Sequence, residues 1–216
     1  MNLNFKYSEK EDVWCLLNKG KTSNNNPNPT ESYLKLIEKL GEDPNKEDVK
    51  LFIKRYLKEL NIEKGPFIKK IESEFDKVSK EFIKIAEKIF GVNLDKGLDV
   101  YFTVNNRCPY SIKENLFFVS FLGKSPLKTI FHELWHFYTW YKFDDKYLEI
   151  VGPQKYNDIK ESLTVLINLE CRNILPNGVE DEGYTQHQEL RSKIKEWWNE
   201  NKDIEYVWKK SVEFLN

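Results

Sequence analysis

The chain has 216 residues, of which 40% are hydrophobic and 14% aromatic, enough for one sizeable core or for one domain with an appended part. Its 34 basic and 35 acidic residues leave a net charge of -1, a balance that favours neither a nucleic acid nor an anionic membrane as partner. The cysteines Cys15, Cys108 and Cys171 form no CxxC pair, which argues against a disulfide framework and a thiolate zinc site. Because reduced thiols suit a reducing compartment and residues 1–11 lack the apolar stretch of a signal peptide, we expect a cytoplasmic protein without a membrane span.

Residues 1–91 predict a helical N-terminal part. Its first 29 residues form a possible arm, in which the segment around Val13 is a short helix or extended, followed by an Asn- and Pro-rich loop over residues 21–30. Apolar residues at helical spacing then predict three helices, which we attribute to core packing. These helices are expected at about residues 30–41, 45–60 and 67–91.

Residues 92–216 predict a second part that contains a small sheet. Residues 98–104 and 115–122 are rich in β-branched and aromatic residues and predict two strands. Ser125 and Pro126 form a typical helix start, and this helix runs to about residue 141. Further helices are expected at residues 153–174, 185–199 and 204–214, the middle one opened by a capping box. The predicted fold class is α+β, mostly helical with a small mixed sheet, and the two parts are expected to pack as one unit.

The helix that begins near Pro126 carries the motif HELWH. Residues i and i+4 share a helix face, so His132 and His136 can point at one metal ion. Glu133 lies about 100° further round the helix, where it can reach a water on that metal as a general base. Two core histidines beside a glutamate are the alternative, but a carboxylate in an apolar helix is costly unless it is paired or linked to a metal. The motif therefore predicts a zinc site.

A catalytic zinc usually takes three protein ligands and keeps one position for water. The extended motif HExxHxxGxxH is absent, since Thr139 and Lys142 occupy its glycine and third-ligand positions, which excludes a metzincin. Glu161 is the best third candidate, because it lies where the next long helix turns from polar to apolar. Asp158, one turn earlier, is its main competitor, and Glu170 lies deeper on a different face.

His187, the remaining histidine, has three open interpretations. It is another zinc ligand, a catalytic donor to a developing oxyanion near the metal, or a hydrogen-bonded core residue. Tyr184 and Arg191 are further candidate donors for the same catalytic role. A fourth protein ligand would close the site and indicate a structural zinc, so the position of His187 decides between two classes of site.

The order of strand, edge strand, HExxH helix and a later helix with a glutamate roughly 25 residues on resembles the gluzincin clan of zinc metallopeptidases. The compact core is similar to that of the minigluzincins and the ImmA/IrrE-like peptidases. The resemblance covers about residues 97–175. It implies that His132, His136 and Glu161 bind zinc and that Glu133 is the general base. The later helix reads ESLTV, without the Asp that follows the ligand glutamate in thermolysin-like enzymes, and the N-terminal part matches no family that we can name.

The resemblance also implies a peptide or protein substrate, bound by strand addition along the edge strand at residues 115–122. Left uncovered, this apolar strand would be an aggregation hazard, so the N-terminal arm is a candidate to cover it. The alternatives are a non-enzymatic binding module with a structural or vestigial zinc site, and metal-dependent hydrolysis of a non-peptide amide. No nucleic-acid or membrane partner is expected, and the sequence does not indicate an oligomeric state.

Overall fold

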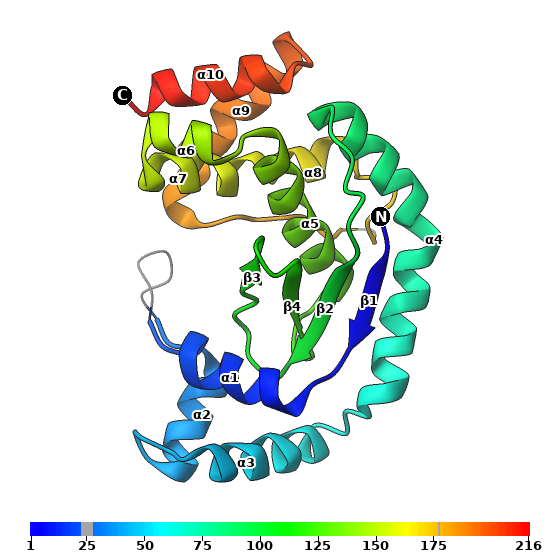
Figure 1. Cartoon of the computed structure of the whole chain (residues 1–216), viewed down its shortest axis with the longest axis vertical. Helices are drawn as coiled ribbons and strands as arrows, with labels where there is room; N and C mark the ends of the chain where they lie inside the picture. Colours follow the sequence, from blue (N-terminus) through cyan, green and yellow to red (C-terminus); the bar gives the residue numbers. More distant parts are fainter. Residues whose placement is uncertain (23–27, 177) are drawn as a thin grey trace. The chain divides into compact units, whose positions relative to one another are not determined.

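The computed structural model describes residues 1–22, 28–176 and 178–216 (Figure 1). The chain divides into two compact units. The helical unit contains Met1 and residues 77–95 and 130–216, and the sheet unit contains residues 2–76 and 96–129. This division differs from the expected boundary between residues 91 and 92, because the helices α4 (Lys64–Phe90) and α5 (Pro126–Lys142) each have residues in both units.

The sheet unit contains a mixed sheet of four strands in the order β1-β2-β4-β3. The strands are β1 (Leu3–Lys6), β2 (Leu98–Thr103), β3 (Tyr110–Ser111) and β4 (Leu116–Ser120). β2 pairs in parallel with β1 and β4, whereas β3 pairs antiparallel with β4. The two predicted strands and the α+β fold class are thus confirmed, and β1 and β3 are additional strands that the sequence did not predict.

The prediction that residues 115–122 form an edge strand is wrong for the first part of β4. β3 pairs with Leu116 and Phe117, and the backbone N–H of Phe118 donates to the carbonyl of Pro109 at 2.9 Å. The strand β1 of the N-terminal arm pairs with β2 and not with β4, but the arm does pack on β4, because Trp14 of its following helix stacks on Phe118 with ring centroids 6.0 Å apart. The chain therefore covers this side of β4 with its own hairpin, a usual protection for an apolar strand.

Helices α1 (Glu9–Lys19), α2 (Glu31–Leu40) and α3 (Lys46–Glu59) belong to the sheet unit and confirm the helical predictions there. Thr30 and Asn45 begin α2 and α3 as N-caps, because their side-chain oxygens accept backbone N–H groups of the first turns. Of the predicted loop at residues 21–30, residues 23–27 lie outside the described part.

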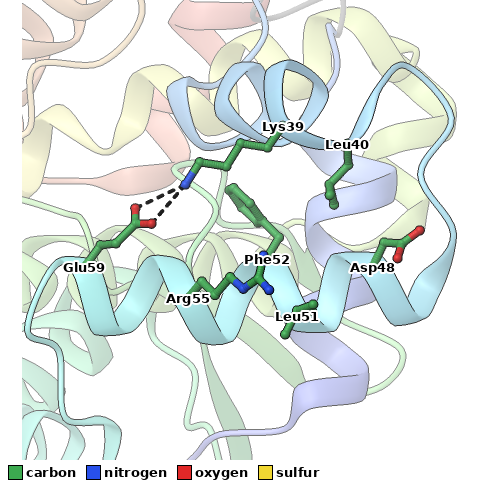
Figure 2. A pocket seen from close by; sticks show the side chains of 7 residues that line it. All are labelled: Lys39, Leu40, Asp48, Leu51, Phe52, Arg55 and Glu59. Atoms are coloured by element: carbon green, nitrogen blue, oxygen red, sulfur yellow. Dashed lines mark hydrogen bonds and ion pairs between the residues drawn. The ribbon is translucent and has the colours of Figure 1, made fainter.

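A hollow of about 290 Å³ lies at α2 and α3. It is bordered by an ion pair between Lys39 and Glu59, whose charged atoms are 3.0 Å apart (Figure 2). Its lining mixes apolar and charged side chains: Lys39, Leu40, Asp48, Leu51, Phe52, Arg55 and Glu59. No helix in the described part of the chain has the length and apolar character needed to cross a membrane.

A buried carboxylate ties α1 to the end of β2. Asp12 is fully buried, and its Oδ1 accepts hydrogen bonds from the Thr103 hydroxyl at 2.7 Å and from the Val104 N–H at 3.0 Å. Burial raises the pKa of Asp12 to about 6, although these hydrogen bonds favour the ionised form. The folded chain thus binds a proton at Asp12 more tightly than the unfolded chain does.

Asp12→Asn is therefore expected to remove part of the pH dependence of stability. As the pH rises from about 4 to about 6, ionisation of Asp12 should lower the free energy of unfolding of the original chain by up to about 3 kcal/mol, since one pKa unit corresponds to about 1.4 kcal/mol. Urea unfolding at pH 4 and pH 7, followed by tryptophan fluorescence, measures this. Equal pH dependence in both proteins would contradict the assignment.

The helical unit contains the later part of α4, most of α5 and the helices that follow. These are α6 (Asp145–Val151), α7 (Pro153–Leu163), α8 (Val165–Glu170), the 3-10 turn η1 (Thr185–His187), α9 (Gln188–Glu200) and α10 (Ile204–Phe214). The single helix predicted over residues 153–174 is divided at Thr164. The Thr164 hydroxyl donates a hydrogen bond to the Glu161 carbonyl at 2.8 Å, and such a side-chain bond competes with the backbone hydrogen bonds of a helix. The capping box predicted at Thr185 is also wrong, since the Gln188 amide donates to the carbonyls of Glu182 and Tyr184.

Aromatic packing in this unit fixes the orientation of α5. Phe82 of α4 stacks on Phe131 with ring centroids 4.1 Å apart, and Phe90 meets the edge of Trp135 at 5.1 Å. Offset and edge-to-face pairs of this kind are favourable beyond the area that they bury. Because Phe131 and Trp135 are four residues apart on one face, the neighbouring face of α5 is left for the motif histidines.

Candidate metal centre

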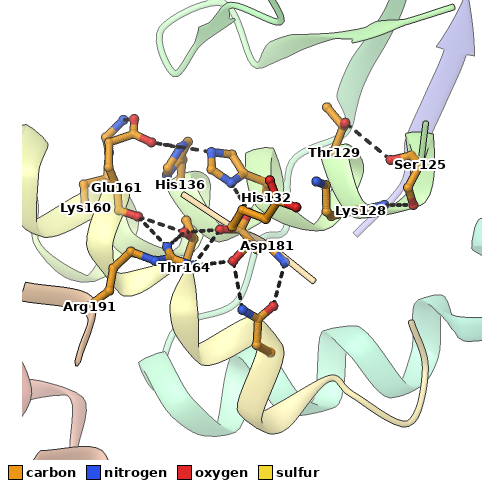
Figure 3. Close-up of polar contacts among 12 residues, drawn as sticks. Ser125, Lys128, Thr129, His132, His136, Lys160, Glu161, Thr164, Asp181 and Arg191 are labelled. Carbon is orange, nitrogen blue, oxygen red and sulfur yellow. Dashed lines mark hydrogen bonds and ion pairs between the residues drawn. The ribbon is translucent and has the colours of Figure 1, made fainter. Parts of the chain in front are cut away.

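Three side chains predicted as ligands converge in the helical unit (Figure 3). Nε2 of His132 and Nε2 of His136, both on α5, lie 3.5 and 3.4 Å from Oε2 of Glu161 on α7. The candidate ligand atoms of the three residues all lie within 4.8 Å of one another. Ligands about 2.0–2.1 Å from a tetrahedral zinc lie about 3.4 Å apart, so these separations fit one shared ion.

The surroundings of His136 and Glu161 change the pKa values of both side chains. Burial, with repulsion from the Lys160 ammonium group, lowers the pKa of His136 to about 3, so this imidazole is neutral, as a metal ligand must be. Burial opposes ionisation of Glu161, but the Lys160 ammonium group and the hydrogen bond from His132 hold the pKa of its carboxyl well below the usual range. The pair therefore supplies a neutral nitrogen and a charged oxygen.

Glu133 is the buried carboxylate of the motif. It is 5% exposed, and its Oε2 has no hydrogen-bond partner among the described residues. Burial raises the pKa of Glu133 to about 8; repulsion from Glu161 acts in the same direction, and His132 opposes it. A buried carboxylate oxygen without a partner is costly, so packing alone does not account for Glu133.

Asp181 is a site residue that the sequence reasoning missed. Its Oδ2 lies 2.6 Å from Nδ1 of His132, and its own carboxylate is held by the Thr164 hydroxyl at 2.9 Å and by Arg191 at 3.1 Å. The backbone N–H of Asp181 donates to the Asn168 side chain at 2.7 Å. A carboxylate on the far nitrogen fixes the tautomer and ring orientation of a metal-binding histidine. Asp181 therefore turns Nε2 of His132 toward Glu161.

The charges of this network reinforce one another. Burial opposes protonation of His132, but the Asp181 carboxylate raises the pKa of His132 well above its usual value. Burial likewise opposes ionisation of Asp181, but His132 and Arg191 hold the pKa of its carboxyl well below the usual range. His132 and Asp181 thus form a tight pair, and a metal ion bound at Nε2 would have to displace a proton from His132.

The competing carboxylates are engaged elsewhere. Oδ1 of Asp158 lies 3.0 Å from Nε2 of His187, and Oε1 of Glu170 accepts the indole N–H of Trp198 at 2.6 Å. Neither residue belongs to the candidate metal-binding group found among the described residues. Glu161 is therefore the third member that the geometry supports.

The predicted oxyanion donors His187 and Arg191 have other partners in the structure. His187 is 3% exposed, faces Asp158 and has the ring of Tyr184 beside it at 5.7 Å. Of its three interpretations, these contacts favour the hydrogen-bonded core histidine. Arg191 donates to the Asp181 carbonyl and to the Thr164 hydroxyl, so its guanidinium supports the loop rather than facing a substrate.

No protein-family model matches the sequence, and comparison with curated proteins and with solved structures finds no match. The resemblance to gluzincins therefore stays a prediction, which depends on the motif and on the group that surrounds it.

Proposed function

We propose that this chain is a zinc-dependent metallopeptidase. The observation that carries the proposal is the convergence of His132, His136 and Glu161 at separations that fit one tetrahedral ion. Glu133, on the same helix as the two histidines, has a buried Oε2 without a hydrogen-bond partner among the described residues. Two imidazoles and one carboxylate form a usual ligand set for a catalytic zinc. The donors also suit other transition metals, but the motif spacing is typical of zinc peptidases.

In this proposal each residue has a distinct task. When bound, zinc would polarise a scissile carbonyl, lower the pKa of a water and favour the ionised form of Glu133. Glu133 accepts a proton from the attacking water and transfers it to the leaving amine. Asp181 keeps His132 in the tautomer that offers Nε2, and burial keeps His136 neutral.

The number of ligands supports a catalytic site over a structural one. A structural zinc takes four protein ligands, whereas a catalytic zinc takes three and leaves one position open. The group identified among the described residues has three members, and His187, the candidate that would have closed it, faces Asp158. This arrangement speaks against a binding module with a structural zinc.

The substrate and location are part of the proposal. A peptide or protein substrate follows from the motif, and strand addition to β4 is confined to the part beyond Phe118, since β3 and Pro109 occupy the earlier part. A cytoplasmic location is supported by the three cysteines, which form no disulfide. Cleavage of a peptide library, with and without a chelator, tests the activity, and a chelator-insensitive or absent cleavage would contradict it.

Purified protein is expected to contain about one zinc per chain at neutral pH, as one three-ligand site predicts. Elemental analysis by mass spectrometry measures this. His136→Ala should lose the metal because it removes one ligand, whereas His187→Gln should keep it, since His187 faces Asp158. Wild-type protein without a transition metal, or equal loss in both variants, would contradict the site.

A further inference from the structure

A buried lysine precedes the third candidate ligand. Lys160 is 3% exposed, although lysines are almost never fully buried unless they are paired. Its Nζ lies 2.6 Å from Oε1 of Glu161, the length of a charge-assisted hydrogen bond. Adjacent residues of a helix do not normally face each other, so this contact differs from the surface ion pairs that helices form at spacings of three or four.

The two oxygens of Glu161 therefore have different partners, as Figure 3 shows. Oε2 faces Nε2 of His132 and Nε2 of His136, while Oε1 accepts a hydrogen bond from the Lys160 ammonium group. We propose that Lys160 is a positioning residue that reserves Oε1, so that Glu161 presents a single oxygen to the metal. This inference rests on the proposed function, because it requires the three-residue group to bind a metal.

The role matters because a carboxylate can bind a metal through one oxygen or through both. An open site needs a free position for water or substrate, and a second oxygen from Glu161 would compete for that position. With a neutral side chain at position 160, Oε1 loses its buried donor, and a buried acceptor without a partner is costly. The metal is then the nearest group that can satisfy Oε1.

Neutralising a lysine that only balances charge would not change how Glu161 coordinates the metal. The Lys160 ammonium group and a metal cation share one carboxylate and repel each other, so removing the ammonium group relieves that repulsion. Neutralising Lys160 should therefore leave the metal bound and change how Glu161 holds it. A change in coordination without loss of metal separates positioning from charge balance.

Cobalt(II) in place of zinc is the probe, because four-coordinate cobalt absorbs visible light more strongly than five- or six-coordinate cobalt. Lys160→Met should bind cobalt with weaker visible absorption than the wild type, and Lys160→Arg, which keeps a cationic donor, should restore the intensity. Lys155→Met is the matched control, since Lys155 lies on the same helix and donates to Asn216.

Equal spectra for the wild type and Lys160→Met would overturn this inference while leaving the proposed function intact. A wild-type chain that binds neither cobalt nor zinc would overturn both. Because Lys160→Met can fail to fold, X-ray absorption at the zinc edge of the wild type supplies a test without any variant. Binding of the carboxylate through one oxygen is expected there, and binding through two overturns the proposal.

Discussion

Glu133→Gln is expected to lower peptide hydrolysis by about 10²- to 10⁴-fold, the usual contribution of a general acid–base group. Glutamine keeps the shape of the side chain but cannot accept and return a proton. Zinc should remain bound, because Glu133 is not a member of the ligand group. The measurement is kcat/KM on a cleaved peptide, together with the zinc content of the same preparation.

Glu170→Gln is the matched control for this variant. Glu170 is an acidic residue of the same unit, but its carboxylate accepts hydrogen bonds from Trp198 and Lys202 and lies outside the ligand group. Its replacement should leave hydrolysis close to that of the wild type. Activity retained in Glu133→Gln, or lost equally in both variants, would remove Glu133 from the role of general base.

The part of the site that the sequence predicts is the part that local periodicity determines. His132 and His136 share a face of α5 because they are four residues apart, and Glu133 takes its place from the same helical repeat. Glu161 was identified by the change from polar to apolar sequence along its helix. These signals are local, and the structure brings the three predicted ligands together.

The missed parts depend on contacts between distant residues. β1 has four residues and β3 has two, so neither carries a periodic pattern long enough to read. Asp181 lies in the acidic loop at residues 180–182, and its place depends on Thr164 and Arg191. Gly183 helps to form this loop with a φ of +65°, and a Cβ there would lie 2.7 Å from the Arg191 guanidinium. No spacing in the sequence specifies such a contact.

Asp181→Asn is expected to weaken zinc binding by about 10- to 100-fold, the usual effect of removing a carboxylate from a metal-binding histidine. Asparagine retains the size of the side chain, but it loses the charge that orients His132 and that offsets Arg191. Breaking a buried ion pair by removing one partner commonly costs about 3–5 kcal/mol, so the free energy of unfolding should fall as well. Competition for zinc with a chromogenic chelator and urea unfolding of the metal-free protein measure the two effects separately.

Asp158→Asn is the control that separates these effects from a general loss of acidic charge. Asp158 also contacts a histidine, but that residue is His187, which lies outside the ligand group. The control should therefore keep the zinc affinity of the wild type. If Asp181→Asn binds zinc as tightly as Asp158→Asn does, Asp181 does not orient His132. Recovery of hydrolysis by Asp181→Asn at saturating zinc would place its main effect on metal affinity, since Glu133, the proposed general base, is unchanged in that variant.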